Sequence, residues 1–99
     1  MAVIGVDLGG TKLAAAVFDH FGNMQYSTTN ALAGRIGKEV GLLIRETIGI
    51  CIGQATSKVE AVGVAVPGIS RSKQGTVWAP NIEGWDDYPL LEEVKSFFP

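Results

Sequence analysis

Two adjacent glycines, Gly9 and Gly10, constrain the fold of this chain more than any other feature of its sequence. The apolar runs on either side of them, residues 2–6 and 13–18, are too short for ordinary helices and are bounded by turn residues, so each is predicted to be a strand. Glycine lacks a Cβ and adopts positive φ angles easily, so the pair predicts a tight turn. The chain is therefore expected to open with a β-hairpin.

The turn carries residue types that bind phosphate. Backbone N–H groups of Gly9 and Gly10 are predicted to converge into an anion-binding concavity. Thr11 adds a hydroxyl donor and Lys12 a positive charge, while Asp7 lies where it can hold Mg²⁺ directly or through water. An ordinary hairpin, in which the charged side chains are solvated and the glycines serve only the turn, fits the same spacing.

The spacing differs from two better-known phosphate-binding motifs. From Gly5 the order is G-x-x-x-G-G, whereas dinucleotide folds use G-x-G-x-x-G and P-loops use G-x-x-x-x-G-K-[ST]. In both of those motifs the glycines open a helix, but here a second strand follows. The predicted geometry is a hairpin that grips phosphate.

Composition limits the size and class of the protein. The 99 residues are 46% hydrophobic and 18% charged with a formal net charge of −2, which predicts one small globular domain without the basic surface of a nucleic-acid binder. This length is too short for a complete two-lobed kinase. Cys51 has no partner for an internal disulfide, and the amino terminus does not resemble a signal peptide, so a cytoplasmic location is expected.

Further elements follow the hairpin. Residues 24–29 are predicted to add a third antiparallel strand, and residues 36–55 have the apolar spacing of an amphipathic helix whose charged side argues against a membrane span. A right-handed crossover would place the next strand, residues 59–66, parallel to the first. A short edge strand at residues 76–79 and a terminal helix from Pro89 complete the prediction. The buried stripe expected for that helix consists of Leu90, Leu91, Val94, Phe97 and Phe98.

Glycines and single reactive residues in these elements allow two interpretations. Gly37, Gly41, Gly49 and Gly53 recur along the long helix, which indicates either tolerated poor helix formers or close approach by a neighbouring helix. Cys51 lies on the apolar stripe and is predicted to be core. His20 lies in a turn and receives no function.

Three segments resemble one protein family in series. They are VIGVDLGGTK at residues 3–12, VGVAVPG at residues 62–68 and WAPNIEGW at residues 78–85. Together they resemble the ROK family (repressors, open reading frames, kinases), which belongs to the actin-like, ribonuclease H-like ATPase superfamily. The resemblance covers residues 1–99 and corresponds to the amino-terminal part of a family member. It implies an incomplete ribonuclease H-like α/β domain: a three-stranded meander, helix, parallel strand, edge strand and terminal helix.

The resemblance implies sugar phosphorylation by the intact protein. A glucokinase-like member would transfer the γ-phosphoryl of ATP, with Mg²⁺, to a hexose hydroxyl, and Asp7, Gly9, Gly10, Thr11 and Lys12 would form the nucleotide-phosphate site. The family's general base and zinc motif would follow Pro99, so this chain alone is expected to be inactive. The sugar itself is not identified by the sequence.

Two residues are candidates for sugar contacts. The resemblance assigns Gly68 to the sugar, although Pro67 and Gly68 also suit a turn that ends a strand. Asn81 has an amide that can both donate to and accept from a hydroxyl, although Asn after Pro is also common turn chemistry. Trp85 is expected to close the core rather than stack on a sugar. Asp86 and Asp87 are expected to cap the terminal helix.

Other functions follow from the same residues. A sugar-sensing ROK transcriptional regulator is the main alternative, but its helix-turn-helix and degenerate phosphate motif are not seen in this sequence. A ribonuclease H-like nuclease would need a second carboxylate beside Asp7 on the central strands. Small-molecule sugar and ATP are the expected partners, without nucleic acid or membrane. Exposed sheet and helix surfaces predict self-association into a homo-oligomer.

Overall fold

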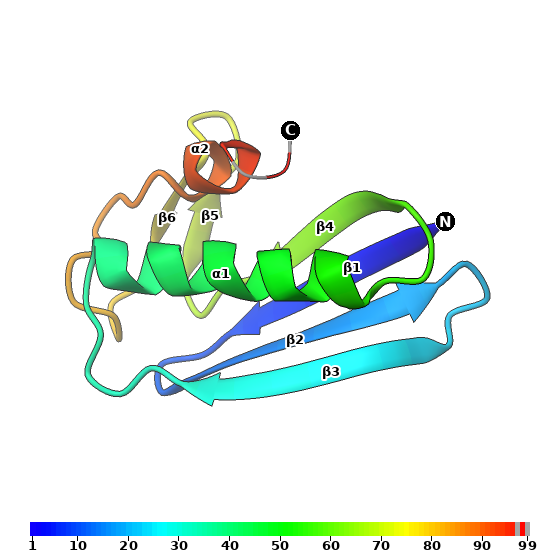
Figure 1. Cartoon of the computed structure of the whole chain (residues 1–99). Helices are drawn as coiled ribbons and strands as arrows, with labels where there is room; N and C mark the ends of the chain where they lie inside the picture. Colours follow the sequence, from blue (N-terminus) through cyan, green and yellow to red (C-terminus); the bar gives the residue numbers. More distant parts are fainter. Residues whose placement is uncertain (97, 99) are drawn as a thin grey trace.

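A four-stranded sheet with one long helix across it forms the body of the domain (Figure 1). The computed structural model describes residues 1–96 and 98. The sheet has the order β3-β2-β1-β4. Its strands are β1 (Ala2–Leu8), β2 (Lys12–Asp19), β3 (Met24–Ala31) and β4 (Val59–Ala65). The first three pair antiparallel and β4 pairs parallel with β1, which confirms the predicted meander and crossover.

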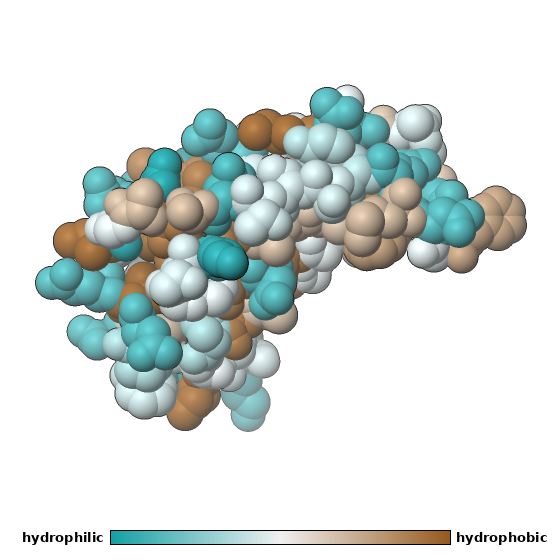
Figure 2. Space-filling view, turned by 90° about the horizontal axis from the view of Figure 1, so that it is seen from below, coloured by the Kyte–Doolittle hydropathy of each residue, from teal (hydrophilic) through white to brown (hydrophobic). Residues whose placement is uncertain are grey.

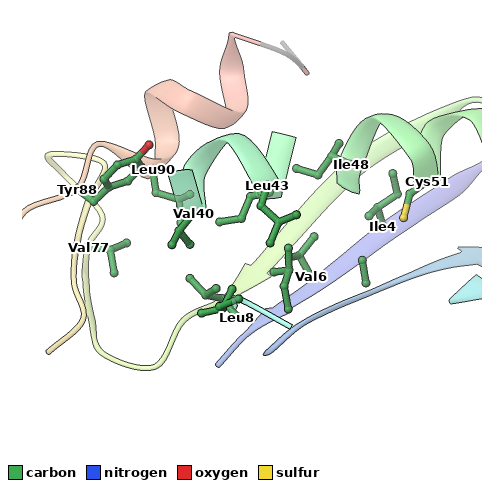
Figure 3. Packing of buried hydrophobic residues seen from close by; sticks show 14 of the residues in the cluster. Ile4, Val6, Leu8, Val40, Leu43, Ile48, Cys51, Val77, Tyr88 and Leu90 are labelled. Carbon is green, nitrogen blue, oxygen red and sulfur yellow. The ribbon is translucent and has the colours of Figure 1, made fainter. Parts of the chain in front are cut away.

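Strand β1 has one buried, apolar face and one exposed face. Ile4, Val6 and Leu8 are almost fully buried, whereas Val3 and Asp7, which alternate with them, are exposed. Successive side chains of a strand point to opposite faces, so one face of the sheet is packed and the other is not. Figure 3 shows the buried side chains filling the space between the sheet and the helix α1 (Lys38–Gln54).

The buried stripe of α1 follows most of the predicted positions. Val40, Ile44 and Cys51 are fully buried, as predicted from the three- and four-residue steps. Ile36 and Ile52 also fall on the three- and four-residue steps predicted to be buried, but they are 44% and 37% exposed, so the prediction was wrong for both. Ile36 precedes the first helical residue, and Ile52 lies about 100° round the helix from Cys51.

A second small sheet and a short helix complete the chain. Strands β5 (Ile69–Arg71) and β6 (Thr76–Trp78) form an antiparallel pair, and α2 spans Leu90–Lys95. A strand near 76–79 was predicted, but it pairs with β5, which the sequence did not predict, rather than with the main sheet. Within α2 the buried residues are Leu90 and Glu93, whereas Leu91 is 48% exposed, contrary to the predicted stripe. Phe97 lies outside the described residues.

The predicted capping of α2 by two aspartates was wrong. The N-cap residue is Pro89, and no side chain donates or accepts a capping hydrogen bond there. Asp87 instead forms an ion pair with Arg71, whose Nη1 lies 3.2 Å from its Oδ1. Because both partners are exposed, this pair adds little stability.

One helix glycine has a clear packing role. A Cβ on Gly41 would overlap the hydroxyl of Tyr88 and would lie 2.9 Å from Oε1 of Glu93 on α2. Close approach of a neighbouring helix is therefore confirmed at this position by Glu93, although the nearest atoms belong to Tyr88, which precedes α2. A Cβ on Gly53 would meet nothing within 4 Å, so that glycine is only tolerated.

The surface is mixed in character. Figure 2 shows hydrophobic residues scattered among hydrophilic and intermediate ones over the face seen from below. Among the described residues, no helix combines the length and apolar character needed to cross a membrane.

Candidate functional site: the Gly10 turn and the Asn81 loop

The predicted hairpin closes at the two glycines. Leu8 pairs with Leu13 across the hairpin, and the Gly9 amide donates a 2.9 Å hydrogen bond to the Lys12 carbonyl. Gly10 and Thr11 therefore form the exposed tip of the turn. The location of the turn between two antiparallel strands is as predicted.

The glycines of the turn do not have the backbone geometry that was predicted for them. Neither Gly9 nor Gly10 has a positive φ angle, so left-handed backbone geometry does not explain them. A Cβ on Gly10 would lie 3.4 Å from the Cβ of Asn81, and a Cβ on Gly9 would lie 3.4 Å from the Lys12 carbonyl oxygen, both at the short limit of ordinary van der Waals contact. A second segment of the chain packs directly on the turn, and the sequence pattern contains no sign of that contact.

Fewer backbone amides of the turn are free to bind an anion than was predicted. The Gly9 N–H is used within the hairpin, so it does not point at an anion. The amides of Gly10 and Thr11 donate to no acceptor within the described part of the chain. Two adjacent free amides with the Thr11 hydroxyl can still bind a phosphate oxygen.

Asp7 is available for a cation. Its side chain is exposed on the open face of the sheet, where β1 pairs it with Ala14 on one side and Ala65 on the other. These small neighbours leave the carboxylate unobstructed, and among the described residues it forms no ion pair. Mg²⁺ is commonly held by one or two carboxylates plus phosphate oxygens, which this single acid fits. Lys12 is exposed on the same face, two residues before Ala14.

A polar cavity joins the turn to the Asn81 loop. Its volume is about 410 Å³, and Gly10, Thr11 and Asn81 line it together. Arg35 and Glu83 line it as well, although sequence reasoning gave neither a role. Nothing local in the sequence places the segment before α1 beside residues 81–83.

Gly68 lies at the same end of the small sheet as Asn81. Its neighbour Ile69 pairs with Trp78, just before the Asn81 loop. A Cβ on Gly68 would overlap the Trp78 carbonyl, so close backbone packing accounts for this glycine. This contact favours the turn interpretation, and a sugar contact at Gly68 stays a prediction.

Trp85 is confirmed as a core residue. It is fully buried, stacks on Tyr88 with ring centroids 4.2 Å apart, and donates from Nε1 to the Gly37 carbonyl at 2.9 Å. It therefore cannot stack on a sugar from this position. Cys51 is buried too, and desolvation raises the pKa of its thiol, as expected of a core cysteine.

Comparison with known proteins supports the family resemblance that the sequence carries at residues 3–12, 62–68 and 78–85. The ROK family profile matches residues 3–98. This chain belongs to the ROK family. The glucokinase of Streptomyces coelicolor is 35% identical over 101 residues, a match that covers 94% of this chain and 28% of that protein. The chain thus spans less than a third of the length of this curated relative.

Solved structures match the fold over nearly the whole chain. The ROK hexokinase of Thermus thermophilus has a TM-score of 0.85 at 31% identity and covers 97% of this chain and 32% of its own. A ROK family glucokinase of Streptomyces griseus, solved in complex with glucose and AMPPNP, has a TM-score of 0.74 at 35% identity over 97% of this chain and 30% of its own. The domain is therefore of the actin-like ATPase kind predicted.

The comparisons and the structure give little support to the two alternatives, a ROK transcriptional regulator and a ribonuclease H-like nuclease. A ROK transcriptional regulator, a homologue of the E. coli MLC protein, shares the fold with a TM-score of 0.82, but at 18% identity over 96% of this chain and 25% of that one it shows the fold alone. Over the described residues, no group of three or more His, Cys, Asp or Glu side chains is placed to hold a metal ion. The carboxylate cluster that a two-metal nuclease needs is therefore not seen there.

Proposed function

We propose that this chain supplies the nucleotide-phosphate turn and one rim of the sugar site of an ATP-dependent hexose kinase of the glucokinase type. The carrying observation is that Gly10 and Thr11, proposed for phosphate, and Asn81, proposed for sugar, line one cavity of about 410 Å³. Phosphoryl transfer requires the donor phosphate and the acceptor hydroxyl to lie side by side.

The relatives support the choice of substrates. The Streptomyces coelicolor relative is a glucokinase, and the Streptomyces griseus structure contains glucose and the ATP analogue AMPPNP. We therefore propose ATP, glucose or a related hexose as partners, and a cytoplasmic location. Homo-oligomerisation stays a prediction of the sequence.

Each proposed residue has a distinct task. The free amides of Gly10 and Thr11 and the charge of Lys12 would bind the terminal phosphate oxygens and stabilise negative charge that develops during transfer. Asp7 would hold Mg²⁺, whose chemical role is to neutralise that charge. Asn81 and Gly68 would orient the sugar hydroxyl toward the phosphate. A general base is proposed to come from outside this chain, so the chain alone is proposed to have no turnover.

A chimaeric enzyme tests the proposal. The matching amino-terminal segment of the Streptomyces coelicolor glucokinase would be replaced by this chain, and glucose phosphorylation would be followed with and without Asp7→Asn. We expect activity in the chimaera and at least about a hundredfold loss in the variant, comparable to the loss of one strong electrostatic contact in a transition state.

Binding to the isolated chain gives a second readout. Titration of the isotope-labelled chain with magnesium AMPPNP should shift the NMR signals of Gly10 and Thr11, and glucose should shift those of Asn81. A folded, inactive chimaera together with unmoved NMR signals would refute the proposal. ATP-dependent phosphorylation of glucose by the isolated chain would refute the proposed lack of turnover.

A further inference from the structure

The loop that carries Asn81 is braced by its own backbone. We call residues 79–85 the rim loop. The Ala79 amide donates to the Trp85 carbonyl at 2.8 Å, and the Trp85 amide donates to the Ile82 carbonyl at 3.2 Å. The Ile82 amide donates in turn to the Ala79 carbonyl at 3.1 Å. Three short-range bonds thus hold the loop in one compact shape around Asn81.

The rim loop is fastened to the start of α1 through both polar groups of one residue. The Gly37 carbonyl accepts the Trp85 indole N–H at 2.9 Å, and the Gly37 amide donates to the Glu83 carbonyl at 2.7 Å. Gly84, at φ +87°, allows this approach, because a Cβ there would lie 2.8 Å from the Gly37 Cα. Since Trp85 is fully buried, an unpaired indole N–H would be costly, which favours this attachment.

The other side of the cavity is tied to the same segment. The Leu32 amide donates to the Thr11 carbonyl at 2.8 Å, so the segment that leads into α1 is fixed to the phosphate turn. Asn81 in turn packs on Gly10, so these contacts form a closed ring around the cavity. The contacts run from the turn to Leu32, along the chain to Gly37, across to the rim loop, and back from Asn81 to the turn.

We propose that Trp85 is a positioning residue that locks Asn81 against the Gly10 turn, so that the sugar rim and the phosphate turn move as one rigid unit. The catalytic significance of this lock rests on the proposed function, whereas the lock itself does not. It implies that closure around substrates changes the distance from this unit to other parts of the site and leaves the spacing of Asn81 to the turn unchanged.

Trp85→Phe tests the lock in the 99-residue chain. The variant removes the indole N–H and keeps a ring stacked on Tyr88. We expect loss of the nuclear Overhauser contact between Gly10 and Asn81. We also expect hydrogen exchange at the Gly37 amide to be at least about tenfold faster than in the original chain, because local opening sets that rate. An unchanged contact and exchange rate in the folded variant would overturn the proposal.

Tyr88→Phe is the matched control. It removes one polar group from the other member of the same stacked pair, but its hydroxyl donates to Glu93 rather than to the rim loop. The contact between Gly10 and Asn81 should survive, and the Gly37 exchange rate should stay within about threefold of the original. Equal loss in both variants would mean general loosening and would overturn a specific role of Trp85.

The unmodified chain gives a readout that does not depend on folding of a variant. The Trp85 indole N–H should exchange far more slowly than that of Trp78, which is 38% exposed, and in step with the Gly37 amide. Fast Trp85 exchange would overturn the lock. Glucose titration separates the two proposals: a lock that is present without Asn81 shifts refutes only the function, whereas Asn81 shifts without the lock refute only the positioning.

Discussion

Two acidic residues in different regions show how the same chemical group serves structure in one place and is free for chemistry in another. Asp7, near the turn, is exposed, and among the described residues it forms no ion pair. Glu93, at the junction of α1 and α2, is buried and accepts a 2.6 Å hydrogen bond from the Tyr88 hydroxyl. Lys38 and Arg45 lie 3.6 and 3.4 Å from its two carboxylate oxygens.

The physical difference is the number of partners that offset desolvation. A buried carboxylate is stable only when it is paired and hydrogen-bonded, and the Tyr88 hydrogen bond, followed by the nearby Lys38 charge, lowers the pKa of Glu93 despite its burial. Burial, followed by the bond to Glu93, raises the pKa of Tyr88. The junction therefore holds the fold together, whereas the turn end keeps its acid open to a ligand. Substitutions at the two ends should separate these roles.

The largest effect is expected at the junction from Gly41→Ala. The added methyl would overlap the Tyr88 hydroxyl, so it must displace Tyr88 from Glu93 or move α2. We expect a loss of about 3 kcal/mol in the free energy of unfolding, measured by urea denaturation. Gly53→Ala in the same helix meets no atom within 4 Å and should stabilise the fold by about 0.5–1 kcal/mol. Equal effects at both positions would contradict the packing role.

An intermediate effect is expected from Glu93→Gln. At pH 7 the loss of the charged pairings should cost about 1–3 kcal/mol of unfolding free energy. Because the pKa of Glu93 is lowered from 4.5, its contribution is present above pH 4.5 and is lost as the pH falls through the lower folded value. The difference between the original and the variant should therefore shrink on acidification below pH 4.5. A difference that stays constant down to pH 2 would contradict a charged Glu93.

The smallest effect on stability is expected at the turn from Asp7→Asn. An exposed carboxylate without an ion pair should change the unfolding free energy by no more than about 0.5 kcal/mol. Any thermal stabilisation of the original chain by magnesium AMPPNP, expected from the proposed function, should disappear in this variant, because a ligand stabilises the fold only when it binds to the folded state. A large loss of stability without ligand would assign Asp7 to the structure and remove the contrast with Glu93.

Local patterns in the sequence determined the elements and the place of the turn. The alternation along residues 2–8, the stripe along residues 36–55 and the glycines between two apolar runs involve near neighbours, whose geometry follows from strand and helix periods. The crossover rule then predicted correctly that β4 runs parallel to β1. Their residue types and places in the chain were sufficient to indicate Asp7, Thr11 and Asn81 as candidate site residues.

Only the tertiary structure decided which residues meet. It showed that Asn81 packs on Gly10, that Tyr88 leaves no room for a side chain at Gly41, and that the Trp85 indole donates a hydrogen bond to Gly37. These pairs are 47 to 71 residues apart in sequence, and neither period relates positions at such distances. Their contacts exist only once burial of the core has brought α1, the rim loop and the turn together. The sequence therefore indicated candidate residues of the cavity but not which residues contact one another around it.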